Sequence, residues 1–284
     1  MRLWVQVMFT ALTNGYVLGF LDGKIYKGSS KRFCVPGLNC YSCPGAVGSC
    51  PIGSLQAVLG SSKYQFSFYV IGFLMIVGSL AGRFVCGWLC PFGLVQDLLY
   101  KIPFVKKVRK VPFDKQLRCL KYVILVVFVI LLPVLVTGIG GTGDPWFCKW
   151  ICPSGTLFAG IPLISMNENL RQTIGFLFGW KMMILLTIII LSVKISRPFC
   201  RYLCPLGAIY GIFNRFSMFH YEVDVENCVE CGMCEKECPM GIRIYEVPNS
   251  PECIRCGKCV QVCPRGAVCT GWRTSKDQEE KPGK

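Results

Sequence analysis

Histidine is nearly absent from the 284-residue chain, which contains only His220. A haem held by two histidines needs a second imidazole, so a cytochrome-type electron path within this chain is excluded. We expect His220 to pack where the apolar part of the chain meets its C-terminal part, rather than to bind a quinone or relay protons. The sequence also has no phosphate-binding loop, no dinucleotide glycine fingerprint and no paired carboxylates in a pocket-like setting. Nucleotide-dependent chemistry therefore has no support.

Acidic residues are also scarce, with 16 Asp and Glu against 31 Lys and Arg. The first 219 residues carry 22 of the basic and 5 of the acidic side chains, so the excess lies between long apolar runs. Contact with anionic lipid headgroups explains basic residues there better than nucleic acid does. We therefore expect the lipid bilayer as a partner and no nucleic acid. The C-terminal part is slightly acidic, which suits a basic partner surface or the basic face of its own membrane domain.

Long apolar runs raise the hydrophobic share to 52% and the mean hydropathy to +0.47. Four runs reach the roughly 17 to 25 residues that span a bilayer, at 3–21, 64–82, 121–139 and 176–196. The first run follows only Arg2 and lacks a small-residue cleavage site, so we expect a retained anchor. The sequence predicts an α-helical integral membrane domain over residues 1–219 with about four transmembrane helices.

The distribution of Lys and Arg predicts the orientation. Near the spans, 14 basic residues fall on the side that holds both termini and 7 on the other side. By the positive-inside rule both termini face the cytoplasm, and the chain is a multi-pass protein of the cytoplasmic membrane.

Cysteine is abundant, with twenty residues, and eight of them form two C-x2-C-x2-C-x3-C-P runs that begin at Cys228 and Cys253. In bacterial two-cluster ferredoxins this spacing binds two [4Fe–4S] clusters, and the fourth cysteine of each run ligates the other cluster. Zinc also binds Cys-x2-Cys pairs, but two complete runs favour iron. The sequence assigns one cluster to Cys228, Cys231, Cys234 and Cys263, and the other to Cys253, Cys256, Cys259 and Cys238. It predicts a small α+β bacterial-type 2[4Fe–4S] ferredoxin-like domain over 220–269 and a disordered charged tail over 270–284.

A second cysteine pattern occurs three times: CGWLCPFG from Cys86, CKWICPSG from Cys148 and CRYLCPLG from Cys200. Cysteines four apart lie on one face of a helix if the segment stays helical, so each copy supplies half of a tetrahedral thiolate set. Proline after the second cysteine suits the first position of a new helix, whose dipole favours a thiolate-bound cluster. We expect the following segments to be short amphipathic helices at the membrane interface. Arg83 and Arg197, each three residues before a copy, would offset the cluster charge.

The copies indicate that one half of the membrane domain is a duplicate of the other, which we call the half-repeat. Each half would contain a span, a CPxG step on the outer side, a second span and a CxxxCP step on the inner side. CPSGTL at Cys152 resembles CPIGSL at Cys50, and both fall on the outer side. The repeat pairs residues around an inner cluster, Cys86 and Cys90 with Cys200 and Cys204. Around an outer one it pairs Cys148 and Cys152 with Cys43 and Cys50, leaving Cys34 and Cys40 as alternates or as a disulfide. Disulfides are the rival for the whole outer set, because that compartment can be oxidising.

Four further residues have weaker signals. Cys119 and Cys269 belong to no motif and are expected to be free thiols. Lys181 lies inside the fourth span near its outer end, where its side chain can snorkel. Asp97 is expected on a solvated helix face.

Together these motifs resemble the membrane polyferredoxins of the NapH/NosR type over roughly residues 64–265. The resemblance implies electron transfer between the quinol pool or cytoplasmic donors and a redox system across the membrane. Its redox partner would be a ferredoxin, a flavoprotein or an oxidoreductase subunit. The chain departs from this type in lacking a large flavin-binding domain and in carrying the extra cysteines over 34–50. We expect an electron-transfer component rather than a catalytic subunit; the alternatives are an iron–sulfur accessory, maturation or redox-sensing protein and an enzyme subunit with its own quinone chemistry.

Overall fold

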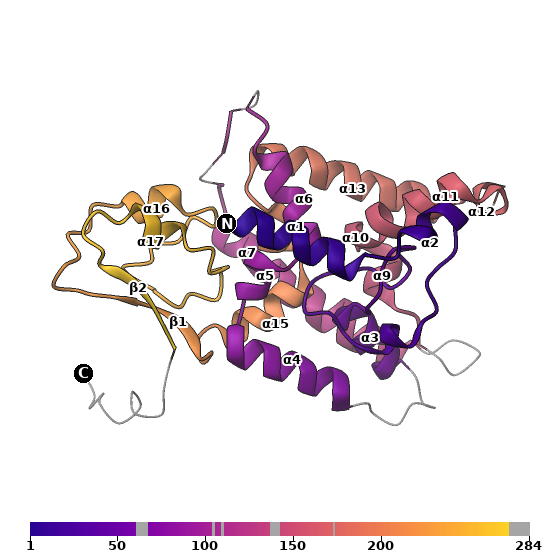
Figure 1. Cartoon of the computed structure of the whole chain (residues 1–284), viewed down its shortest axis with the longest axis horizontal. Coiled ribbons are helices and arrows are strands. Elements are labelled where there is room, and N and C mark those ends of the chain that lie inside the picture. The colour runs from indigo at the N-terminus through magenta and orange to yellow at the C-terminus, as the bar shows by residue number, and fades with distance from the viewer. Residues whose placement is uncertain (61–67, 104–105, 109–110, 137–142, 173, 273–284) are drawn as a thin grey trace.

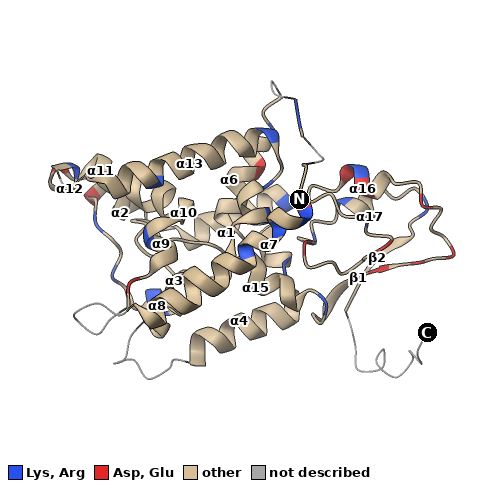
Figure 2. Cartoon of the chain, turned by 180° about the vertical axis from the view of Figure 1, so that it is seen from behind, with Lys and Arg blue, Asp and Glu red and all other residues tan. Residues whose placement is uncertain are grey.

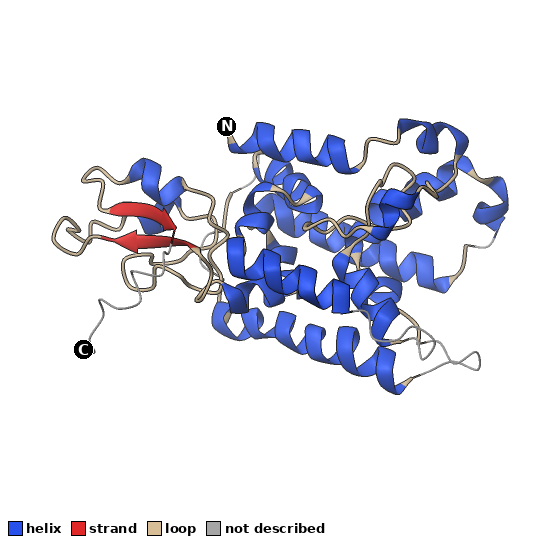
Figure 3. Cartoon of the chain, turned by 60° about the horizontal axis from the view of Figure 1, so that its bottom comes forward, coloured by secondary structure: helices blue, strands red, loops and turns tan. Residues whose placement is uncertain are grey.

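The computed structural model describes residues 1–60, 68–103, 106–108, 111–136, 143–172 and 174–272. A helical domain forms most of the chain, and a small domain lies at one end of the long axis (Figure 1). Within the described residues, both strands belong to the small domain (Figure 3). The N-terminus lies near the junction, where Arg2 forms an ion pair of 2.7 Å with Asp97.

The helical domain divides into two runs of elements. The first run contains α1 (Arg2–Thr13), α2 (Val17–Asp22), the 3-10 helix η1 (Ser29–Arg32), α3 (Pro51–Leu59), α4 (Phe68–Ala81), α5 (Phe84–Trp88) and α6 (Pro91–Tyr100). The second run contains α7 (Asp114–Ile124), the π-helix η2 (Leu125–Leu131), α8 (Leu132–Leu135), α9 (Trp146–Trp150), α10 (Pro153–Gly155), the π-helix η3 (Thr156–Gly160), α11 (Ile161–Met166), α12 (Glu168–Gln172), α13 (Phe176–Lys194), α14 (Pro198–Tyr202) and α15 (Pro205–Phe213).

Two helices among the described residues are long and apolar enough to cross a membrane, and they indicate membrane association. One is the continuous helix Asp114–Leu135, made of α7, η2 and α8, and the other is α13. The second agrees with the predicted run 176–196, whereas the first begins well before residue 121. Part of the predicted run 64–82 forms α4, which has 14 residues, and residues 61–67 lie outside the described part.

The first apolar run is not one helix. The predicted continuous span over 3–21 is wrong, because α1 ends at Thr13 and α2 begins at Val17. The Thr13 hydroxyl donates to the Phe9 carbonyl at 2.9 Å, and the Asn14 amide donates to the Thr10 carbonyl at 3.1 Å, which satisfies the last carbonyls of α1. The cysteine-rich loop docks at this break, where the Val47 amide donates to the Thr13 carbonyl at 3.0 Å.

The short helices that follow each Cys-Pro step lie in the core. As predicted, proline occupies the first turn of α3, α6, α10 and α15. The expectation of an interfacial position is wrong for α6, which buries Phe92, Leu94 and Gln96, and for α15, which buries Leu206 and Tyr210. These side chains pack around the cysteines, so the proline helices form the centre of the helical domain.

The small domain contains β1 (Phe219–Val223), α16 (Met233–Glu237), α17 (Lys258–Val262) and β2 (Val268–Trp272). The two strands are antiparallel, with Phe219 opposite Trp272. Strand β2 therefore passes the predicted boundary at 269, and residues 273–284 of the predicted tail lie outside the described residues. On β1, His220 is buried, with ring nitrogens 3.0 Å from the Met218 carbonyl and 2.8 Å from Glu222, as fits a packing residue.

Candidate metal centres

The small domain gathers its eight motif cysteines into two groups. One small cavity is lined by the distal set, Cys228, Cys231, Cys234 and Cys263. Another is lined by the proximal set, Cys238, Cys253, Cys256 and Cys259. These groups coincide with the sets assigned from the sequence, including the crossed fourth cysteine of each run. The two runs also share a backbone shape, with positive φ at Glu230 and Gly232 in one and at Arg255 and Gly257 in the other.

The proximal set is the more buried of the two, and its thiols are held in an apolar environment. Burial first, and then the neighbouring thiols of Cys238 and Cys256, raise the pKa of Cys253 to about 12. Burial likewise raises the pKa of Cys259 to about 12. Thiols of this kind are protonated at neutral pH, so thiolate ligation would couple metal binding to proton release.

The helical domain brings together the inner set, Cys86, Cys90, Cys200 and Cys204. All four are at most 6% exposed. Each CxxxC segment is a one-turn helix that ends before the second cysteine, because Cys90 and Cys204 are the N-caps of the helices that follow. The Gly207 amide donates to Cys204 Sγ at 3.4 Å, so the start of α15 faces a sulfur.

Two buried arginines connect the halves of the inner set. Arg83 donates to the Cys200 carbonyl at 2.9 Å, and Arg197 donates to the Cys86 carbonyl. Each arginine thus precedes one CxxxC pair in the chain and binds the other pair. Both positive charges therefore act on the inner set, where the motif spacing led us to expect them.

Asp97 is the counterion of Arg197, and its expected place on a solvated face is wrong. The carboxylate is buried and lies 2.8 Å from Arg197 Nε and 2.6 Å from Arg197 Nη2. Burial alone would raise its pKa, but Arg197, followed by Arg2, holds the pKa of Asp97 below its ordinary value. An isolated helix-face pattern could not reveal this, because the partner is 100 residues away in the chain.

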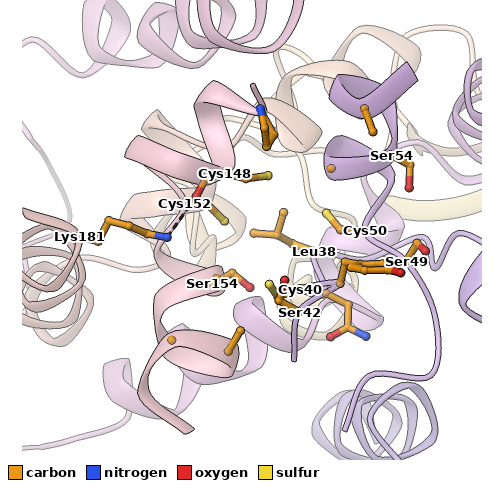
Figure 4. Close-up of a pocket in the computed structure, with 18 of the residues that line it drawn as sticks. Leu38, Cys40, Ser42, Ser49, Cys50, Ser54, Cys148, Cys152, Ser154 and Lys181 are labelled. Carbon is orange, nitrogen blue, oxygen red and sulfur yellow. Dashed lines mark hydrogen bonds between the residues drawn. The ribbon is translucent and has the colours of Figure 1, made fainter. Parts of the chain in front are cut away.

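The outer set differs by one residue from the expected group. Cys40, Cys50, Cys148 and Cys152 line one cavity of 690 Å³ and point toward its centre (Figure 4). Cys43, the expected fourth member, lies instead against the break after α1, where its thiol donates to Asn14 Oδ1 at 3.6 Å. The loop over 34–50 docks at that break and thereby directs Cys40 into the cavity. No disulfide joins any of the twenty cysteines, all of which the structure describes; Cys119 and Cys269 are exposed.

Lys181 also belongs to the outer cavity. Its ammonium donates to the Cys148 carbonyl at 3.2 Å (Figure 4). This contact replaces the expected snorkelling and parallels the contact of Arg83 with the Cys200 carbonyl.

Two glutamines that the sequence analysis missed contact the cysteine sets. Gln96 donates to Cys200 Sγ at 3.2 Å, and Gln56 donates to Cys148 Sγ at 3.3 Å. The sequence feature that could have identified them is their shared position, six residues after the cysteine of a CPxG step.

The proximal set lies directly against the inner set. Gly87, between Cys86 and Trp88, lies so close to the Ile254 carbonyl that an added Cβ would collide with it. The Trp88 indole donates to the Arg255 carbonyl at 2.9 Å, and Glu252 pairs with both Arg83 and Lys121. The chain segments that carry the two sets are thus in van der Waals contact.

The inner set is connected in turn to the outer set by the loop over 36–40. A Cβ on Gly37 would lie 3.1 Å from the Cys90 Cα, and Leu38 is buried in the same core cluster as Cys90. Leu38 also lines the outer cavity (Figure 4). The Tyr210 hydroxyl fixes this loop by donating to the Pro36 carbonyl at 3.1 Å.

The described side chains do not form a site for a single metal ion. A zinc site needs Zn–S bonds of about 2.3 Å. Among the described residues, no group of three or more His, Cys, Asp or Glu side chains is close enough to hold a single ion. Four cysteines nevertheless surround each cavity, so the residues fit a larger group such as a four-iron cube.

Comparison with known families agrees with this geometry. Residues 65–112, 122–169 and 177–221 match the 4Fe-4S binding domain, and residues 220–264 match the 4Fe-4S dicluster domain. The chain is therefore an iron–sulfur protein that binds several 4Fe–4S clusters. It belongs to the polyferredoxin family of the NapH/NosR type.

Three relatives illustrate the range of similarity. A Methanocaldococcus jannaschii protein is 34% identical over 181 residues, or 61% of this chain and 65% of its own length. The methylamine utilization ferredoxin-type protein MauN of Paracoccus denitrificans is 26% identical, over 59% of this chain and 50% of its own. The regulatory protein NosR of Pseudomonas aeruginosa is 30% identical, over 56% of this chain and 20% of its own. The chain thus spans less than two thirds of each relative, and no solved structure matches it.

Proposed function

We propose that the chain is a membrane-embedded electron-transfer protein whose distal, proximal, inner and outer cysteine sets each hold a [4Fe–4S] cluster. The observation that carries this proposal is the contact between successive sets, through Gly87 and Ile254 and then through Gly37 and Leu38. Such a cluster supplies a site that takes up and returns one electron. The buried cysteines, arginines and apolar side chains hold these sites in order and keep water away from them.

The distal set is the proposed contact for a cytoplasmic redox partner, a ferredoxin, flavoprotein or oxidoreductase subunit. Cys231 is the one exposed cysteine among the sixteen of the four sets. Acidic positions lie on the loops of the small domain (Figure 2). The exposed residues Asp224, Glu226 and Glu230 immediately precede or lie within the first cysteine run. A basic surface on the partner would complement them.

The outer set is the proposed contact for the quinone pool or an extracytoplasmic redox partner. Its cavity measures 690 Å³, whereas the cavities at the distal and proximal sets measure 20 Å³ each. The outer cavity therefore has room for a molecule beside a cluster. Its walls include the apolar residues Leu38, Ala159 and Leu163 together with Lys181, which suits a quinone headgroup.

In this proposal the helical domain crosses the cytoplasmic membrane four times, the first time with the interrupted segment of α1 and α2, and both termini lie in the cytoplasm. The Lys and Arg distribution supports that orientation. The sets then run from the cytoplasmic small domain to the outer side.

A regulatory or accessory role is the second candidate, because one relative bears the name regulatory protein NosR. The two roles differ in turnover. Rapid, reversible reduction of every cluster by a low-potential donor supports electron transfer, whereas slow reduction with an effect only on a partner's maturation supports the accessory role.

The test of the main proposal replaces Cys90 or Cys204 by serine in the full chain, purified without oxygen. Each variant should lose about four irons, one cluster's worth, keep the EPR signals of the small domain, and no longer pass electrons from those clusters to a membrane acceptor. Cys119→Ser, at an exposed cysteine, is the control. Full iron content and normal transfer in both variants would overturn the proposal.

A further inference from the structure

Gln56 and Gln96 occupy matching places at the outer and inner sets. Each stands six residues after the cysteine of a CPxG step, Cys50 or Cys90, on the helix that begins at that step. Their exposed fractions are 0% and 1%. Burial of an amide is unfavourable unless its polar atoms are hydrogen-bonded, so the bonding partners indicate what each side chain is held for.

The carbonyl oxygen of each glutamine binds the start of a CxxxC segment. Gln96 Oε1 accepts from the Phe199 amide at 3.2 Å, and Gln56 Oε1 accepts from the Phe147 amide at 2.9 Å. These phenylalanines immediately precede Cys200 and Cys148. Each glutamine therefore connects a motif of the first half of the chain to the facing motif of the second half.

The amide nitrogen of each glutamine points at the first sulfur of the same segment. Gln96 Nε2 lies 3.2 Å from Cys200 Sγ, and Gln56 Nε2 lies 3.3 Å from Cys148 Sγ. The same nitrogens also donate to the carbonyl four residues earlier in their own helices, at 3.3 Å to Phe92 and 3.2 Å to Ile52. This second bond fixes the orientation of the amide, with nitrogen toward sulfur.

The surroundings of the two sets differ, which argues against a shared packing role alone. Arg83 and Arg197 lie beside the inner set, whereas Lys181 lies beside the outer cavity. The glutamine contacts nevertheless recur bond for bond. A hydrogen bond to a thiolate ligand stabilises the more negative, reduced form of an iron–sulfur cluster and so raises its reduction potential.

We propose that Gln56 and Gln96 are positioning residues that orient the Cys148 and Cys200 thiolates and raise the reduction potentials of the outer and inner sets, respectively. This inference rests on the proposed function, in which both sets hold clusters. It assigns one potential-setting donor to each membrane set, and the donor comes from the half of the chain that does not carry the sulfur it contacts.

The test uses Gln56→Met and Gln96→Met in the full chain, because methionine has a similar size and no donor. Anaerobic samples are analysed for iron and titrated potentiometrically with EPR detection. We expect wild-type iron content and, in each variant, one EPR signal with a lower reduction potential. The expected shift is about 59 mV for one electron, which corresponds to about a tenfold change in the equilibrium constant of reduction. A different signal should move in each variant. Exposed Gln116 provides the control, Gln116→Met.

Glutamate substitution separates the two bonds. Gln96→Glu keeps an acceptor for the Phe199 amide, loses the donor and adds negative charge, so the same signal should again move to lower potential. Loss of one cluster's iron in the Gln96 variants alone, with the other signals intact, also supports the positioning role. Unchanged potentials at full iron content would overturn this inference and leave the proposed function standing. Wild-type protein with only the iron of the small domain would overturn both.

Discussion

The charged side chains beside the inner set can be buried because each of them is paired with groups of complementary charge or polarity. Arg197 is 0% exposed, yet its guanidinium contacts the Asp97 carboxylate and the carbonyls of Cys86 and Gly87. Arg83 is buried in the same way and pairs with Glu252. Removing one partner of such a pair leaves a buried charge without compensation, so these residues stabilise the site only as complete groups.

Asp97→Asn should therefore destabilise the helical domain. The neutral amide leaves the Arg197 charge uncompensated, and the expected loss in the free energy of unfolding is about 3–5 kcal/mol. Denaturant unfolding in detergent micelles would measure it. The matched control is Asp144→Asn, since Asp144 pairs with Lys149 at an exposed site, where a loss below about 1 kcal/mol is expected. Equal losses in the two variants would contradict the assignment of Asp97 to a buried pair.

A second residue-scale prediction compares two cysteines of the same loop. Cys40 lines the outer cavity and Cys43 contacts Asn14 outside it. Cys40→Ser should thus remove about four irons, whereas Cys43→Ser should keep the full content. Iron and sulfide analysis of the two anaerobically purified variants decides between them. The reverse result would restore the set expected from the half-repeat.

At the scale of elements, the one-turn helix α5 forms one of the contacts between the two domains. Its residues Gly87 and Trp88 touch the backbone at Ile254 and Arg255, and the first cysteine of the inner set precedes them. Glycine is required at 87 because the carbonyl occupies the space of a side chain. The approach of the proximal set to the inner set thus depends on one missing Cβ.

Gly87→Ala should separate the two domains slightly without removing any ligand. The added methyl group collides with the Ile254 carbonyl, so iron content should stay constant while electron transfer from the small domain to the inner set becomes slower. Stopped-flow reduction with a low-potential donor would measure the rate. Gly72→Ala is the control, because nothing lies within 4 Å of a Cβ at that position of α4. A rate unchanged in both variants would argue against transfer across this contact.

At the scale of the whole molecule, short-range patterns predicted more than long-range ones. The distal and proximal groupings followed from cysteine spacing, because the C-x2-C-x2-C-x3-C-P run is specific for such clusters. The inner grouping followed from the half-repeat, which pairs two copies of one short motif. The exchange of Cys43 for Cys40 depends on where the loop docks against Asn14, and the burial of Asp97 depends on Arg197. Such contacts join residues distant in sequence. Hydropathy alone predicted a continuous helix across residues 14–16, because it contains no information on the side-chain hydrogen bonds of Thr13 and Asn14 that end α1.

The orientation of the chain gives the last prediction. Reporter fusions after Lys110 and after Asn167 should report opposite compartments, with the first in the cytoplasm. Helix α13 separates the two regions: the Val108 amide donates to the Lys194 carbonyl at its C-terminal end at 2.9 Å, and α12 precedes its start. Nineteen helical residues extend about 28 Å, close to the roughly 30 Å of a hydrocarbon core. Signals from the same compartment would contradict the four-span arrangement, and the outer cavity would then open on the same side as the small domain.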